Sequence, residues 1–268
     1  MKSYSISTLL MSSLAVAFFA FSAAGQDAPK DNRSAEDIVK AVAEKGAFGF
    51  KQGSAQIEMK VTKKSGSIKS NTMTVKAMRS DGLLRSMVRF DKPVKIAGMS
   101  FLVRQKKDAL PDQYVYIPAA KVVRRIAAGN AGSSFFGSDF TYGDLMPLPT
   151  SQADKVSLKR LPDALVGGQP VNVVEITPKV EGSPYGKLVV SVHSQKLTPL
   201  KIEFFDPKMA PLKTLSTKKL KKIDEELIPV EMEMVNLQKG SKTLIRILEM
   251  NPKAELSDSD FTEEAMQR

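Results

Sequence analysis

Apolar and polar residues alternate with a period of two along most of the chain. In the segment 55–61, Ala, Ile, Met and Val occupy every second position, and Gln, Glu and Lys lie between them. Similar segments recur roughly every 8–14 residues and are separated by turn sequences such as Ser80-Asp81-Gly82. A period of two is typical of a β-strand with one apolar and one solvated face. The pattern predicts strands at 54–62, 73–77, 84–90, 101–103, 114–117, 122–126, 156–161, 171–177, 188–193, 200–205, 215–223, 230–234 and 242–250.

One stretch before these strands has a helical period instead. Ser34 is a suitable N-cap, acidic residues follow it in the first turn, and Gly46 provides a stop. Apolar residues at 38, 39, 41 and 42 form one face, so we expect an amphipathic helix over 34–45 that packs on a sheet. A second short helix is expected at 258–267.

The short turns and the one-sided strands predict the fold class. About a dozen antiparallel strands curl under their own twist, and an open barrel results. We therefore expect a mainly β chain with a few helices (α+β). In it, a strongly curved antiparallel sheet forms an incomplete barrel, and short helices cap the concave side.

One loop is unusually apolar. The segment 133–145 carries four aromatic residues among Gly, Ser and Asp, although loops are normally polar. It is either a lid over the core of the protein itself or a lid over a cavity that holds an apolar ligand. The helix at 34–45 is a candidate for a second part of the lid. The residues assigned to the lid loop are Phe135, Phe136, Gly137, Asp139, Phe140 and Tyr142.

The apolar positions of the strands contain several methionines. Methionine is flexible and suits surfaces that accept apolar partners of different shapes, although it also serves as ordinary core filler. A large one-sided sheet with little helix to cover it favours a cavity. The residues predicted to line that cavity are Ile57, Met59, Met73, Val75, Ile202, Phe204, Met232 and Met234.

The first 25 residues have the composition of a secretory signal peptide. Lys2 gives a positive start, residues 9–21 are mostly apolar, and small residues around Ala24 offer a cleavage site. The apolar run is shorter than the ~20 residues of a membrane span, which favours cleavage over an uncleaved anchor. We expect a signal peptide at 1–25 and a single domain at 26–268.

The chain of 268 residues contains no cysteine. This excludes disulfides, thiol catalysis and thiolate metal sites, and it also excludes lipidation at an N-terminal cysteine. Export without lipidation predicts a soluble protein of the periplasm, with secretion as the alternative. We expect a monomer.

The net charge is strongly positive at +11, and loss of Lys2 with the signal peptide lowers it to +10. Such a charge favours anionic partners such as phospholipid headgroups, polyanionic glycans or acidic protein surfaces. No nucleic-acid recognition motif is present, so nucleic acid is not an expected partner.

Two basic clusters are candidates for contacts. A lysine cluster is interpreted as a docking patch for an anionic membrane or an acidic partner, and alternatively as a solvated edge strand that discourages aggregation. Two adjacent arginines lie in one predicted strand, so one of them should face inward and hold a lid carbonyl or a lipid headgroup; a plain salt bridge is the alternative. These residues are Lys218, Lys219, Lys221 and Lys222 in the patch, and Arg124 and Arg125 in the strand.

The sequence offers little catalytic chemistry. His193 is the only histidine, so neither a zinc-type metal site nor a cofactor site is predicted. Ser138 lies close to Asp139 and Asp144, but no base accompanies it and Gly-x-Ser-x-Gly is missing. We interpret these aspartates as caps of turns in the lid. The protein is not expected to be an enzyme.

Five motifs stand out along the chain: Phe90-x-x-Pro93, Gly98-x-x-Phe101-Leu102, Tyr114-x-Tyr116-x-Pro118, Arg124-Arg125-Ile126 and Phe136-Gly137-Ser138-Asp139-Phe140-x-Tyr142-x-Asp144. Together they resemble a known family, the periplasmic outer-membrane lipoprotein-sorting proteins related to the carrier LolA. The resemblance extends from about Ile38 to Phe261 and is densest between Phe101 and Leu145.

The resemblance implies a curved antiparallel barrel whose apolar interior receives acyl chains. It implies a soluble carrier that moves lipid, lipoprotein or other hydrophobic cargo between the inner and outer membranes, and an RND-type exporter as a partner. The membrane-anchored acceptor LolB has an N-terminal cysteine, which this chain lacks. The alternative function is that of an envelope-lipid sensor or scaffold similar to RseB, which contacts a membrane protein.

Overall fold

The computed structural model describes residues 31–45, 52–107, 109–146 and 155–268. The signal peptide predicted at 1–25 lies outside these residues. None of the described helices is long and apolar enough to cross a membrane.

The described residues form one antiparallel sheet of thirteen strands that is not closed into a barrel. Every predicted strand is confirmed, with longer bounds in most cases. The strands are β1 (Gln52–Thr62), β2 (Ile68–Ser80), β3 (Leu83–Lys92), β4 (Ser100–Arg104), β5 (Asp112–Ile117), β6 (Val122–Arg125), β7 (Val156–Val166), β8 (Gln169–Pro178), β9 (Lys187–His193), β10 (Pro199–Phe205), β11 (Pro211–Ile223), β12 (Glu226–Asn236) and β13 (Ser241–Asn251).

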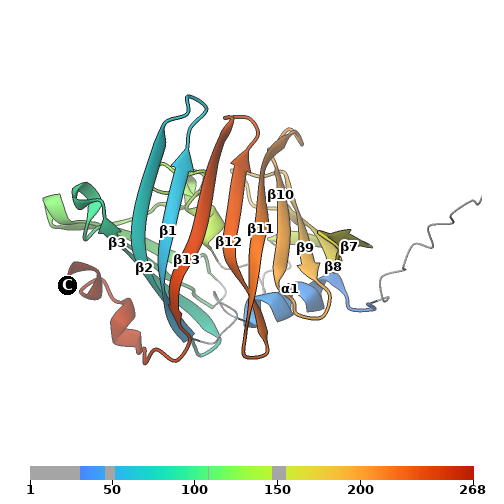
Figure 1. Ribbon diagram of the computed structural model, residues 1–268, viewed down its shortest axis with the longest axis horizontal. Helices are drawn as coiled ribbons and strands as arrows, with labels where there is room; N and C mark the ends of the chain where they lie inside the picture. The colour runs from blue at the N-terminus through green and yellow to red at the C-terminus, as the bar shows by residue number, and fades with distance from the viewer. Residues whose placement is uncertain (1–30, 46–51, 108, 147–154) are drawn as a thin grey trace, which may run out of the picture.

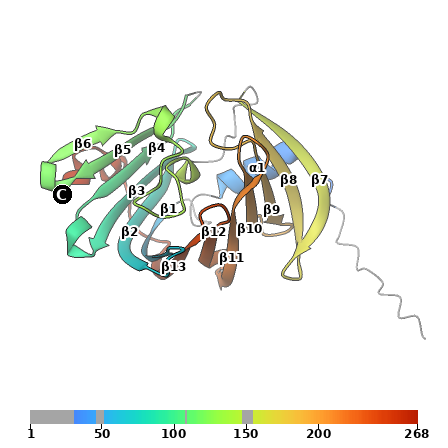
Figure 2. The same ribbon diagram turned by 90° about the horizontal axis from the view of Figure 1, so that it is seen from above.

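Two meanders make up the sheet, and one long-range pairing joins them. The strand order is β6-β5-β4-β3-β2-β1-β13-β12-β11-β10-β9-β8-β7. Strands that lie side by side in the sheet are also consecutive in the sequence, with the exception of β1 and β13. These two strands pair from Ser54 with Asn251 to Thr62 with Lys242. The edge strands of the sheet are therefore β6 and β7, and the sheet bends around the β1–β13 seam into a trough (Figure 2).

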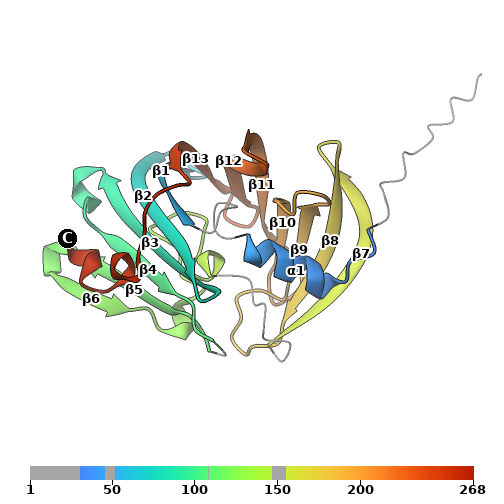
Figure 3. The same ribbon diagram turned by 90° about the horizontal axis from the view of Figure 1, so that it is seen from below.

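The predicted helix is confirmed as α1 (Ala35–Glu44). Ser34 caps it: its hydroxyl accepts a hydrogen bond from the Asp37 backbone N–H, and the Asp37 carboxylate reaches back to the N-cap backbone in a capping box. Ile38 and Val39 are buried against the concave side of β8 and β9. Figure 3 shows α1 lying across the trough on the β7–β9 side.

The C-terminal segment covers the convex side of the other half. It forms two 3₁₀ turns, η5 (Asp258–Phe261) and η6 (Ala265–Gln267), where a short helix was expected. Phe261 and Met266 are buried against Met87, Leu102 and Tyr116. The prediction that each strand has a charged outer face is wrong for β3–β5, since these strands are covered on both sides.

Candidate ligand-binding face

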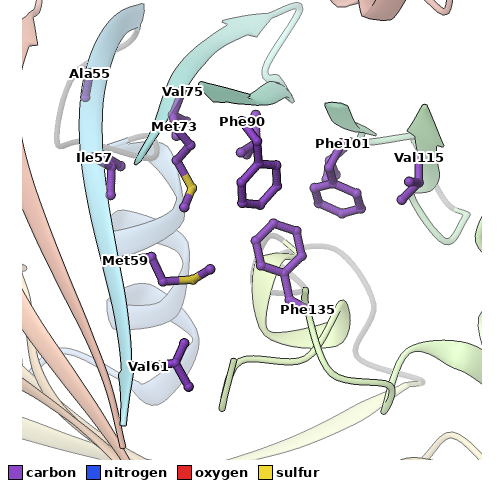
Figure 4. Close-up of a cluster of buried hydrophobic side chains, with 12 residues drawn as sticks. Ala55, Ile57, Met59, Val61, Met73, Val75, Phe90, Phe101, Val115 and Phe135 are labelled. Carbon is purple, nitrogen blue, oxygen red and sulfur yellow. The ribbon is translucent and has the colours of Figure 1, made fainter. Parts of the chain in front are cut away.

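The concave side of β1–β5 is lined by apolar side chains. Four of the residues predicted to line a cavity, Ile57, Met59, Met73 and Val75, are buried in one cluster there (Figure 4). The alternation of β1 and β2 directs these side chains to the same face, because residues two apart in a strand point the same way. The same cluster includes Phe90, Phe101, Val103 and Val115 from the next three strands.

The lid loop, residues 133–145, lies over this face. Phe135 points from the loop toward Phe90 and Phe101 (Figure 4), with its ring centroid 5.3 Å from that of Phe101. The rings of Phe136 and Phe90 are 4.3 Å apart, and those of Tyr142 and Phe101 are 5.4 Å apart. The aromatic side chains of the lid loop therefore pack directly on the concave face.

This packing agrees with the simpler of the two interpretations of the loop, a cover over the protein's own core. Phe135 is only 4% exposed, and the lining residues beneath it are buried. Two surface pockets of about 580 and 410 Å³ lie elsewhere, beside the C-terminal segment. A ligand on the concave face of β1–β5 would have to displace the lid loop.

The remaining predicted lining residues belong to the second half of the trough. Phe204 and Met234 are buried with Tyr185 in a separate cluster, where Ile202 is partly buried. Phe140 packs against both this cluster and the one under the lid loop. Met232 is half-buried, so the eight residues flank the lid loop on two sides and do not form one continuous lining.

The tip of the lid loop is a tight turn. Phe136 and Gly137 both have positive φ, 48° and 79°. A positive φ is costly for a bulky residue, and here the Phe136 ring gains contacts with Phe90 and Phe135. The turn is closed by hydrogen bonds from the Phe135 backbone N–H to the Phe140 carbonyl, 2.8 Å, and from the Ser134 hydroxyl to the Ser138 carbonyl, 2.6 Å.

Asp139 fastens the lid loop to β13. Its carboxylate is buried and accepts hydrogen bonds from the hydroxyls of Ser241, at 2.5 Å, and Thr243, at 2.7 Å. The prediction that this aspartate caps a turn inside the loop misses the contact, because Ser241 and Thr243 are about a hundred residues away in sequence.

Asp144 fastens the lid loop to β11. Its Oδ2 lies 2.5 Å from Nζ of Lys213, and its Oδ1 accepts a hydrogen bond of 2.6 Å from the Tyr185 hydroxyl. It also accepts the Thr141 backbone N–H at 2.7 Å, which is the turn cap that the sequence predicted. Burial lowers the pKa of Lys213, and the nearby Asp144 carboxylate opposes that shift. Burial, followed by the charge of Asp144, raises the pKa of Tyr185.

Lys213 and Tyr185 were not identified from the sequence. Lys213 has the same strand parity as Leu215, which faces the trough, so a lysine at an inward position was the available signal. Tyr185 follows the turn Gly182-Ser183-Pro184 and offered no signal, because nothing local indicates which way it points.

The strand register decides which of the two arginines faces inward. Arg124 pairs with Val115 and so shares the concave side, whereas Arg125 pairs with Tyr114 and binds Asp112 at 2.5 Å on the convex side. Both arginines are exposed, because β6 is an edge strand. Among the described residues, Arg124 has no hydrogen bond to the lid loop, and the salt bridge to Asp112 belongs to the outward-facing Arg125.

The lysine cluster is exposed on β11. Lys218, Lys219, Lys221 and Lys222 are all exposed near the β11–β12 hairpin. Ion pairs of Lys218 with Glu233 and of Lys222 with Glu225 are long, 3.8 and 3.6 Å. β11 pairs with β10 only from Pro211 to Ser216, so the lysine segment pairs with β12 alone and leaves an unpaired edge on its other side, as the alternative interpretation expects.

The residues considered for catalysis have structural contacts. Ser138 donates its hydroxyl hydrogen to the Phe135 carbonyl at 2.6 Å. Nδ1 of His193 accepts the backbone N–H of Gln195 at 3.2 Å, and burial lowers the pKa of this histidine. Within the described part of the chain, no group of three His, Cys, Asp or Glu side chains could hold a metal ion.

Three solved structures are similar to the whole of this fold. A domain described as outer membrane lipoprotein-sorting, from Vibrio parahaemolyticus, matches with a TM-score of 0.80 and 29% identity, over 87% of this chain and 98% of the other. A DUF1329 family protein from Desulfovibrio piger matches with a TM-score of 0.77 and 23% identity, over 87% of this chain and 98% of the other. A LolA superfamily protein from Nitrosomonas europaea matches with a TM-score of 0.68 and 18% identity, over 87% of this chain and 99% of the other.

The sequence comparisons add less. A family model described only as "Uncharacterized protein" matches residues 82–268. No curated protein sequence matches the chain. None of the three similar structures is described as an enzyme.

Proposed function

We propose that the chain, which has the LolA-like fold, belongs to the outer-membrane lipoprotein-sorting proteins and is a periplasmic carrier of hydrophobic cargo. The cargo is a lipid, a lipoprotein or another molecule with an acyl chain, held on the concave face in place of the lid loop. The carrier moves this cargo between the inner and outer membranes, and an RND-type exporter is a candidate donor.

One observation carries the proposal: the apolar concave face of β1–β5 is covered by a single loop. The aromatic side chains of the lid loop contribute packing contacts that an acyl chain can replace, because apolar contacts are not directional. Its polar attachments include those at Asp139 and Asp144. Gln113 also donates a hydrogen bond to the Tyr142 carbonyl at 2.9 Å, and Lys63 donates one to the Gly137 carbonyl at 2.8 Å. Such a cover can leave and return without any change to the strands.

The energetics favour exchange without a chemical step. Burying an acyl chain gains about 0.8 kcal/mol per CH₂ relative to water, but close to nothing relative to a bilayer. Cargo can therefore pass from one membrane to the face and from the face to another membrane. The proposal also assigns residues 1–25 to a cleaved signal peptide and 26–268 to a single carrier domain, and it needs no enzymatic activity.

The first experiment is native mass spectrometry of the protein purified from an envelope extract without detergent, followed by lipid analysis of the bound fraction. A defined extra mass that resolves into one lipid or lipoprotein class supports the carrier. A clean apo mass together with no uptake from liposomes overturns it. A stable stoichiometric complex with a membrane protein and no lipid transfer would favour the alternative function, an envelope-lipid sensor.

A locked lid provides the matched control. Thr243 and Asp139 meet at 2.7 Å between side-chain atoms, and the chain has no cysteine of its own. The double variant Asp139→Cys/Thr243→Cys can therefore form only the introduced disulfide. Lipid transfer between two liposome populations should stop when this variant is oxidised and resume when it is reduced. Equal transfer in both states would show that the lid loop does not gate the site.

A further inference from the structure

Lys213 is a buried cation on the concave face. It lies on β11 and is 2% exposed. Its ammonium is 4.9 Å from the ring centroid of Phe204 and 5.2 Å from that of Tyr185. A charged group in such apolar surroundings is unfavourable unless an anion or several hydrogen-bond acceptors accompany it.

The ion-pair and hydrogen-bond partners of Lys213 all belong to the lid loop. Asp144 supplies the carboxylate at 2.5 Å, and the carbonyl of Asp139 accepts a second hydrogen bond at 3.2 Å. Among the described residues, no carboxylate of the sheet forms an ion pair with Lys213. When the lid loop leaves, the ammonium therefore stays on β11 without a counter-charge.

We infer that Lys213 receives the anionic group of the cargo when the lid loop opens, in place of the Asp144 carboxylate. The cargo class is then an acyl chain that carries an anionic oxygen group, either a carboxylate or a phosphate. This inference rests on the proposed carrier function and adds a charge requirement to it.

The remaining half of the site is already in position. The Tyr185 hydroxyl donates to Asp144 at 2.6 Å, and Tyr185 does not belong to the lid loop. The pKa of Tyr185 is raised by burial, so its hydroxyl keeps its hydrogen at neutral pH. An incoming carboxylate or phosphate meets one ammonium and one phenol donor, the same pair that now holds Asp144. Buried Phe204 and Met234 beside them offer apolar contacts to the adjoining chain.

The lid carboxylate and the anion of the cargo thus compete for one cation. Cargo without an anionic group would have to leave Lys213 unpaired in an apolar cluster, and this cost discriminates against it. The same competition explains how the lid can close again: once the cargo has been released to a membrane, Asp144 is the nearest anion.

The test compares matched ligands that differ only in charge. Binding of cis-parinaric acid and of its methyl ester is measured by fluorescence with the wild-type chain, with Lys213→Met and with Asp144→Asn. The wild type should bind the acid at least about tenfold more tightly than the ester, as expected for one charge-assisted contact. In Lys213→Met the ratio of the two dissociation constants should fall to about one. Asp144→Asn removes the competing carboxylate and should tighten binding of the acid.

A matched control is Lys187→Met. Lys187 also forms an ion pair, with Glu175 at 2.9 Å, and it also stacks over an aromatic ring, that of Phe205 at 4.9 Å. Its strand parity is opposite to that of Leu188, so it lies on the convex side. This variant should keep the ratio of the wild type.

Competition with dipalmitoyl phosphatidic acid and with dipalmitoylglycerol separates a phosphate from a carboxylate as the preferred group. Equal affinity for acid and ester in the wild type, or an unchanged ratio in Lys213→Met, overturns the inference and leaves the carrier standing. Failure of both the wild type and Asp144→Asn to bind any of the four lipids overturns the carrier as well. Asp144→Asn keeps Lys213, so it gives a result even when Lys213→Met does not fold.

Discussion

Asp139 and Thr243 are joined by a reciprocal pair of hydrogen bonds across about a hundred residues of sequence. The Asp139 backbone N–H donates to the Thr243 hydroxyl oxygen at 2.9 Å, and that hydroxyl donates to the Asp139 carboxylate at 2.7 Å. Both residues are buried. The pair fixes the lid loop at the β13 side of the seam where the two halves of the sheet meet.

The first prediction concerns this attachment. Asp139→Ala should lower the free energy of unfolding by about 2–3 kcal/mol, because it leaves the hydroxyls of Ser241 and Thr243 buried without their charged acceptor. The lid loop should also become the first site of proteolytic cleavage. Urea unfolding and limited proteolysis measure the two effects.

The control for that prediction is Asp139→Asn, which keeps an acceptor oxygen and most of the shape. It should lose less stability than Asp139→Ala and keep the loop protected. An alanine variant that unfolds at the wild-type urea concentration would show that the reciprocal pair contributes little.

The second prediction concerns the C-terminal segment. Phe261 is 1% exposed and packs on Met87 and Leu102 on the convex side. Phe261→Ala should cost about 3–5 kcal/mol of unfolding free energy, the usual range for a buried phenylalanine. Hydrogen exchange should then increase in β4 and β5, since these strands lose their outer cover.

Leu248→Ala is the comparison for Phe261→Ala. Leu248 is an exposed apolar residue on β13, so its truncation should change stability by no more than about 0.5 kcal/mol. Similar losses in the two variants would mean that burial under the C-terminal turns does not stabilise the sheet.

The third prediction concerns acid. Hydrogen bonds from Arg33 lower the pKa of Asp31 to about 2. The carboxyl of an unfolded chain titrates near 3.9, so this group stabilises the fold above about pH 4 and loses that contribution as the pH falls toward 2. Asp31→Asn should therefore be less stable than the wild type at pH 6, and the difference should become small near pH 2 and vanish below it.

Urea midpoints of the two proteins at several pH values measure this prediction. Arg33 also donates to the Ser194 carbonyl and, at 3.3 Å, to Asn172, so the lead-in to α1 should loosen over the same pH range. A stability gap of equal size at pH 6 and pH 2 would contradict the assignment.

The fourth prediction concerns the lysine patch on β11. Changing Lys218, Lys219, Lys221 and Lys222 to glutamine should weaken binding to liposomes that contain phosphatidylglycerol by about a thousandfold, at about 1 kcal/mol per lysine. The contribution should fall with added salt, because exposed charges are screened. Co-sedimentation with liposomes at two salt concentrations measures it.

A second set of four exposed lysines tests whether position matters. The set is Lys60, Lys64, Lys69 and Lys239. Figure 1 shows the β11–β12 hairpin at the lower end of the sheet and the β1–β2 hairpin, which carries Lys64, at the upper end. If changing this second set to glutamine weakens liposome binding as much as changing the patch on β11, the effect comes from net charge and not from a docking patch.

The local pattern of the sequence determined the elements. Each strand was predicted from the alternation of apolar and polar residues, because the apolar positions are the ones whose side chains are buried on folding. Ser34 and the acidic turn after it located the start of α1 for a similar reason, since an N-cap acts within four residues. The aromatic content of the lid loop also showed that this loop had to cover an apolar face.

The tertiary structure decided how these elements meet. The pairing of β1 with β13 makes both of these strands interior, and no local signal carries that information. The covering of β3–β5 by Phe261 follows from a contact between segments more than 140 residues apart. The same holds for Lys213 and Asp144: the sequence places each on its own element, but only the curvature of the sheet brings the cation and the carboxylate together in a space that excludes water.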